Sequence, residues 1–213
     1  MISKDNIISR LEEGKYYFQD YSNKELVIPF DLLPDELLNR AINHFQQKNY
    51  EDALLSSKRA IECQMDCLLF SFGYYKYSKK KKWPFPKKMK VLADLGISTP
   101  RILGRINTVR NKIEHDYKSP EPEFVETALD VTEVFSKYVE KYWKRFRIDI
   151  AIAFEDSEDY LLLDFNPSIG EFNIGYSECI GVQYNVINRF SIKVDDEIYF
   201  DFLKKYLNIY DDW

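Results

Sequence analysis

The stretch from Arg110 to Tyr117, RNKIEHDY, gathers an arginine, an amide, two acids, a histidine and a tyrosine. One of the chain's two histidines, His115, lies here. An imidazole exchanges protons near neutral pH, and a guanidinium grips a phosphate through two parallel hydrogen bonds. Together they can cleave RNA: the ribose 2′-OH attacks the adjacent phosphate, the histidine moves protons, and the arginine offsets charge on the pentacoordinate state. DNA lacks the 2′-OH, so this chemistry would select RNA.

The motif ends a predicted helix whose N-cap is Thr99 and whose first residue is Pro100. At about 100° per residue, one side of this helix is an apolar stripe and the other is small and polar. The stripe holds Ile102, Ile106, Val109 and Ile113, and the polar face holds Gly104, Asn107, Thr108, Asn111 and His115. This face is open to three interpretations: it faces solvent, it binds a substrate, or it packs against a second helix. Solvated helices usually expose Lys and Glu, so the absence of both favours a substrate or a second helix.

Arg110 and Glu114 share the flank between the two faces, where they are expected to pair at i,i+4. Arg110 and His115 are separated by about 140° around an ideal helix, so they do not lie side by side. Three arrangements remain open: the long arginine arm reaches round, the helix distorts near Ser119, or a two-fold dimer packs this face against itself and completes the site.

Periodicity predicts a mostly α chain that is α+β overall, with three consecutive parts. Residues 1–33 hold a short helix and a strand at 25–30, residues 34–146 form a bundle of four to five helices, and residues 147–213 form a small β-rich region. The expected helices of the bundle cover 35–47, 50–75, 88–95, 100–115 and 123–145. The expected strands after it cover 148–154, 160–165, 171–176, 179–184 and 190–194, before a terminal helix at 198–207.

The net charge of −5, from 30 basic and 35 acidic residues, does not indicate a nucleic-acid binder as a whole. Residues 76–90 nevertheless hold eight lysines and no acid, in what is predicted to be a loop. Such a loop is either simply solvated or an RNA contact, with aromatic rings available to stack on bases. The candidate RNA-binding residues are Lys79, Lys80, Lys81, Lys82, Trp83, Lys87 and Lys88.

Cysteine usage and hydropathy indicate a soluble, cytoplasmic protein without metal or cofactor. Cys63 and Cys67 lie on one side of a predicted helix and are interpreted as buried thiols. No second cysteine pair or histidine cluster completes a zinc site. The sequence shows no leader and no apolar run of about 18 residues, so we expect no membrane association.

The region from Pro34 to Arg145, roughly half of the chain, resembles the HEPN family (higher eukaryotes and prokaryotes nucleotide-binding). The family hallmark is R-x(4–6)-H, and Arg110 to His115 matches it with a spacing of four. The segment YEDALLSSKRAIE, Tyr50 to Glu62, resembles the family's second helix. Tyr117 extends the match to R-x(4)-H-x-Y, a form found in HEPN toxins paired with minimal nucleotidyltransferase antitoxins.

The resemblance implies a homodimeric, metal-independent ribonuclease that acts as a toxin or antiviral defence effector and leaves 2′,3′-cyclic phosphates. Arg110 and His115 would be catalytic, with Asn111 assisting. Tyr117 would be the hydroxyl that an antitoxin blocks with AMP, unless it merely continues the core stripe. Two other functions stay open: a non-catalytic module that binds nucleotide or nucleic acid in a larger assembly, and a dimeric adaptor. Compact HEPN toxins lack a β-rich tail, so the last 65 or so residues are expected to be a sensor, an inhibitor contact or an interface.

Overall fold

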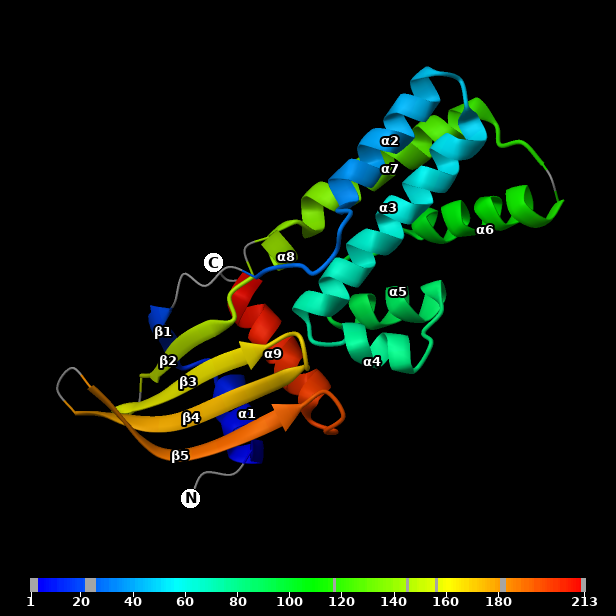
Figure 1. Cartoon of the computed structure of the whole chain (residues 1–213). Coiled ribbons are helices and arrows are strands. Elements are labelled where there is room, and N and C mark those ends of the chain that lie inside the picture. Colours follow the sequence, from blue (N-terminus) through cyan, green and yellow to red (C-terminus); the bar gives the residue numbers. More distant parts are fainter. Residues whose placement is uncertain are drawn as a thin grey trace. The chain divides into compact units, whose positions relative to one another are not determined.

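A computed structural model describes residues 4–21, 26–116, 118–144, 146–155, 157–180 and 183–211 (Figure 1). The fold is α+β, with helices and a five-stranded antiparallel sheet. The chain forms two compact units, which interleave along the sequence rather than following one another. We call them the sheet unit, comprising residues 1–26, 70–80 and 145–213, and the helical unit, comprising residues 27–69 and 81–144.

The helical unit is built from amphipathic helices that bury their apolar sides against one another. In Figure 1, α2 and α7 run side by side. Leu37, Leu38 and Ala41 of α2 pack with Ala60 of α3 and Leu129 of α7. The unit comprises α2 (Pro34–Gln46), most of α3 (Tyr50–Ser71), α5 (Phe85–Asp94), α6 (Arg101–Asp116), α7 (Pro122–Val139) and α8 (Lys141–Lys144).

A buried hydrogen bond joins α3 to α7 inside this unit. The Thr132 hydroxyl donates to the Ala128 carbonyl at 2.6 Å, so its oxygen is left to accept from the Ser57 hydroxyl at 2.7 Å. Both side chains are fully buried. The two hydroxyls therefore satisfy each other where solvent cannot.

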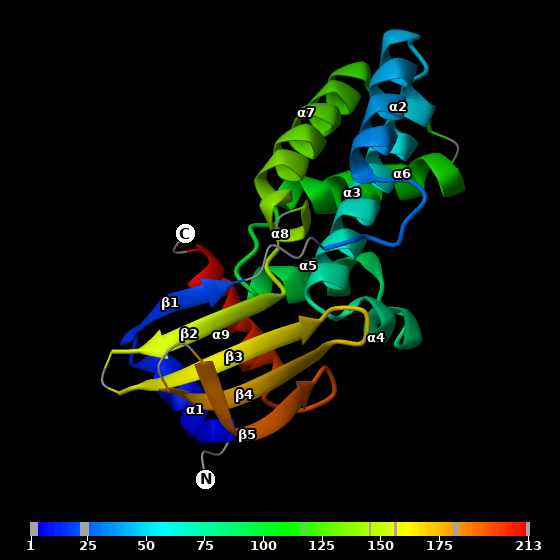
Figure 2. The same cartoon turned by 60° about the vertical axis from the view of Figure 1, so that its left-hand side comes forward.

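The sheet unit is a meander in the order β1-β2-β3-β4-β5, with α1 and α9 on one face (Figures 1 and 2). Phe172 of β4 stacks on Phe165 of β3 at 4.2 Å between ring centroids and meets Phe202 of α9 at 4.9 Å. Within this unit no described helix covers the opposite face. Its elements are α1 (Lys4–Glu12), β1 (Tyr16–Tyr21), α4 (Tyr75–Lys80), β2 (Asp149–Phe154), β3 (Asp159–Asn166), β4 (Glu171–Ile180), β5 (Gln183–Lys193) and α9 (Tyr199–Asp211).

The turn after α3 is held by backbone contact and by a buried hydroxyl. The Tyr199 hydroxyl donates to the Phe72 carbonyl at 2.8 Å. Gly73 and Gly170 both have positive φ, at 74° and 65°, and their backbones touch, so that a Cβ on Gly73 would lie 2.5 Å from the Gly170 Cα. The turn therefore belongs to the core of the sheet unit.

Three predicted segments are wrong. The strand expected at 179–184 is instead divided between the end of β4 and the start of β5, which pair with each other. Residues 26–30 form no strand; the N-terminal strand is instead β1, which pairs antiparallel with β2, Tyr16 opposite Phe154. Pro29 lacks an N–H for such a ladder, whereas the aromatic run of β1 favours a strand.

The lysine-rich segment is mostly helical rather than a loop. Pro84 caps α5, and Pro86 stands in its first turn, where a proline is tolerated.

Both edge strands of the sheet are irregular. The register of β1 against β2 shifts between Phe18 and Asp20. In β5, Val186 and Asn188 pair with the consecutive residues Ser177 and Tyr176, so Ile187 is an extra, bulged residue. Bulges at sheet edges discourage pairing with another chain. Among the described helices, none has the length and hydropathy needed to cross a bilayer.

Candidate active site

The motif helix α6 packs on α7, but its core stripe is turned slightly from the predicted one. Leu103 and Ile106 are fully buried and Ile113 is 7 % exposed, whereas the predicted core residues Ile102 and Val109 are only half-buried. Leu103 was missed in the sequence. Because Arg110 lies two turns beyond Leu103, this rotation leaves its side chain half-buried along the flank of the helix.

The polar face of α6 is not covered by the described helices of its own unit. Thr108, Asn111 and His115 are exposed, and Gly104 and Asn107 are half-buried. A Cβ placed on Gly104 would find no heavy atom within 4 Å. The Thr108 hydroxyl turns back to donate to the Gly104 carbonyl at 3.0 Å. Within the described helical unit, therefore, the space in front of this face can accept another molecule.

Arg110 and Asn111 are brought together. Arg110 Nη1 donates to Asn111 Oδ1 at 3.2 Å, which draws the guanidinium from the flank toward the polar face. Asn111 shares that face with His115, one helical turn further on. His115 itself makes no hydrogen bond, ion pair or ring contact with any residue of the described ranges. Its ring nitrogens are therefore available to a substrate.

The end of the motif helix is fixed by the chain that follows it. The helix stays regular through Asp116, so no distortion before that point brings Arg110 closer to His115. The Ser119 hydroxyl donates to Glu51 Oε1 at the start of α3, 2.8 Å away. Tyr117 and the side chain of Glu114 lie outside the described residues, so the roles predicted for them stay predictions.

The candidate RNA-binding lysines do not belong to one unit. Lys79 and Lys80 end α4 in the sheet unit, whereas Lys81, Lys82, Trp83, Lys87 and Lys88 belong to the helical unit. Lys88 has a structural partner: its ammonium lies 2.5 Å from Asp66 Oδ1 on α3, and both side chains are mostly buried. Lys87 lies over the Trp83 ring, 5.6 Å from its centroid. Lys80 and Lys82 are exposed.

The sequence singled out no residue of the sheet, although one signal was present. Gly175 stands inside a predicted strand, where glycine weakens the sheet and often marks a place that another molecule approaches. The residues around it come from three strands, and their proximity depends on strand register. No sequence pattern collects them.

Comparison of this chain with protein-family models, with curated proteins and with solved structures finds no match.

Proposed function

We propose that this chain is a metal-independent endoribonuclease of the HEPN type, acting as a toxin or antiviral defence effector. The observation that carries the proposal is the polar face of α6, where Asn111 and His115 are exposed on one side and the Arg110 guanidinium is hydrogen-bonded to Asn111. Arg110 and His115 match the R-x(4–6)-H hallmark, and they lie on a helix of an all-helical unit.

Each of the three residues has a defined task in this mechanism. His115 takes the proton of the ribose 2′-OH and then returns one to the leaving 5′ oxygen. The Arg110 guanidinium binds the scissile phosphate and offsets charge in the pentacoordinate state. Asn111 holds that guanidinium in place through its Oδ1. Acid–base catalysis contributes roughly 10²–10⁴-fold, and positioning of the RNA against these residues supplies further acceleration.

A second copy of the chain would complete the site. Arg110 and His115 are about 140° apart on one helix, so a phosphate between them is better served by groups from two helices. Two α6 polar faces related by a two-fold axis would place two such sets around one groove. The open space in front of Gly104 leaves room for this approach. In the same proposal, a nucleotidyltransferase-type antitoxin would block the groove by transferring AMP to Tyr117.

The test uses the full chain, a mixed-sequence RNA and a buffer containing EDTA. We expect cleavage with products ending in 2′,3′-cyclic phosphate, and a loss of at least about 100-fold in rate for His115→Ala and Arg110→Ala. His44→Ala is the matched control, since His44, the chain's other histidine, lies on α2 outside the motif and should leave the rate unchanged. If the chain binds RNA without cleaving it, the proposal is wrong and the chain is a non-catalytic HEPN module. If it neither binds nor cleaves RNA, the dimeric adaptor is the remaining function.

A further inference from the structure

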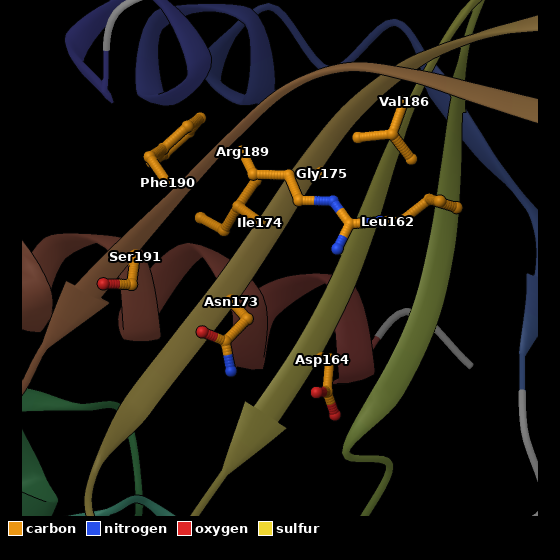
Figure 3. A pocket seen from close by; sticks show the side chains of 9 residues that line it. All are labelled: Leu162, Asp164, Asn173, Ile174, Gly175, Val186, Arg189, Phe190 and Ser191. Carbon is orange, nitrogen blue, oxygen red and sulfur yellow. The ribbon is translucent and has the colours of Figure 1, made fainter.

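The face of the sheet opposite α1 and α9 is hollowed by a groove of about 540 Å³ over β3, β4 and β5 (Figure 3). Two rows of side chains cross it. In the first row Asp164, Asn173 and Ser191 lie opposite one another, and in the second row Gly175 lies between Leu162 and Arg189. The groove therefore has a polar end and an end that combines aliphatic walls with one cation.

Gly175 forms a floor without a side chain. A Cβ there would lie 3.6 Å from the Leu162 Cβ and 3.5 Å from Val186 Cγ1, which is ordinary van der Waals contact. Packing of this chain alone therefore does not require a glycine, although glycine costs stability inside a strand. The glycine leaves the backbone at this point open to close approach by another group.

The β5 bulge sets the composition of the groove. Val186 and Arg189 are three residues apart and in a regular strand would face opposite sides of the sheet. Because Ile187 is an extra residue, both face the groove. Figure 3 shows the Arg189 side chain extended across Gly175 toward Leu162. The bulge in β5 thus places the Val186 side chain and the Arg189 guanidinium on the same side of the sheet as Gly175.

The charged side chains of Asp164 and Arg189 lie apart from each other in the groove. In the described ranges, the side chains of Asp164, Asn173 and Arg189 make no hydrogen bond or ion pair, and Arg189 does not reach Asp164. The polar end of the groove therefore carries the carboxylate of Asp164 and the amide of Asn173. A phosphate dianion would be repelled there, whereas a ligand with one anionic and one cationic group matches both ends.

We propose that this groove binds a free α-amino acid with an aliphatic side chain. The carboxylate pairs with the Arg189 guanidinium. The ammonium donates to Asp164 Oδ and to the amide oxygen of Asn173. The aliphatic side chain packs over Gly175 between Leu162 and Val186. The site lies wholly in the sheet unit and does not depend on the ribonuclease proposal.

The test is calorimetric titration of the full chain with L-leucine, leucinamide and 4-methylpentanoate, of which the last two each lack one charge. We expect saturable binding of leucine and at least about tenfold weaker binding of both analogues. Arg189→Gln should weaken leucine binding at least about tenfold, whereas Lys204→Gln, on the exposed side of α9, should not change it. Gly175→Val should abolish binding by filling the floor, without lowering the melting temperature, because valine suits a strand.

Four results would overturn the proposal. They are no saturable binding of leucine, isoleucine or valine; equal binding of leucine and its two analogues; preferential binding of AMP or inorganic phosphate; and leucine binding to Arg189→Gln with the affinity of the unaltered chain.

Discussion

At the scale of single residues, Arg10 shows how one side chain can join distant segments. Its guanidinium lies 3.9 Å from the Phe154 ring centroid, 3.3 Å from Asp159 Oδ2 and 3.0 Å from the Ser157 hydroxyl. Burial foremost, and then the Asp159 carboxylate, raise the pKa of Tyr176 to about 12. Its hydroxyl therefore stays protonated and donates to Asp159. This cluster fastens α1 to the β2–β3 hairpin and to β4.

The same cluster predicts a pH dependence of stability. Burial opposes ionisation of Asp159, but hydrogen bonds from Tyr176, Ser157 and Arg10 outweigh it and hold its pKa below the ordinary value. A depressed pKa in the folded state means that stabilisation is present above the unfolded pKa, near 4, and is lost as pH falls through the folded value. Between pH 5 and 2, the unaltered chain should therefore lose more unfolding free energy than Asp159→Asn, whose amide does not titrate.

Urea unfolding at several pH values measures this difference. The exposed Asp164→Asn serves as the control and should keep the acid dependence of the unaltered chain. If the unfolding free energy of Asp159→Asn and that of the unaltered chain fall in parallel with pH, Asp159 does not have the stabilising role predicted for it.

At the scale of elements, the turn between α3 and α4 depends on a pair of glycines in contact. Gly73→Ala would place a Cβ against the Gly170 backbone and the Tyr199 hydroxyl, at a φ of 74° that disfavours any side chain. We expect a loss of about 3 kcal/mol or more in unfolding free energy, since strain and overpacking add. Gly96→Ala is the matched control: φ is 94°, but no atom lies within 4 Å, so its loss should be about 1 kcal/mol.

Thermal or urea denaturation of the two glycine variants separates crowding from backbone strain. Equal losses for Gly73→Ala and Gly96→Ala would mean that the Gly73–Gly170 contact contributes nothing beyond conformation.

The elements also show where sequence patterns succeed and where they fail. Helices α2, α6 and α7 follow from apolar periodicity, because that signal is local. The lysine-rich segment resembles a loop, since charge and two prolines hide the short apolar sides of α4 and α5. Strand β1 was missed because its partner β2 lies far along the chain, and pairing is decided by the whole sheet.

The candidate site follows the same division. Motif spacing put Asn111 and His115 on one exposed face, and the structure places both there. The phase of the helix was less well predicted, since the burial of Leu103 depends on where α7 lies. The Arg110–Asn111 hydrogen bond depends on the rotamers of both side chains, and the spacing of residues in the sequence does not determine rotamers. The sheet groove depends on register and on one bulge, so only Gly175 signalled it.

At the scale of the whole molecule, the two units cannot be separated at a single point in the chain. Residues 70–80 lie between segments of the helical unit but pack with the sheet unit. Phe72 meets Phe146 at 5.8 Å, and Tyr74 meets Tyr199 at 5.3 Å. A chain that ends at Lys144 would therefore leave Phe72 and Tyr74 without their partners.

We expect that truncation at Lys144 yields a helical protein that self-associates and binds a hydrophobic dye, because the uncovered aromatic rings meet water. Size-exclusion chromatography and dye fluorescence measure this. The same truncation carrying Phe72→Ser and Tyr74→Ser is the control and should be less associated. A truncated chain that elutes at the same apparent stoichiometry as the full chain, with low dye fluorescence, would contradict the expectation.

The pairing of β1 with β2 has a consequence for biosynthesis. Translation runs from the N-terminus, so the aromatic residues of β1 emerge early, whereas β2 is made only after the entire helical unit. On the ribosome, the helical unit can therefore fold around its own core while β1 is still unpaired. During that interval Tyr16, Tyr17 and Phe18 form an exposed, aggregation-prone aromatic segment. We expect chaperones to bind this segment until β1 pairs with β2.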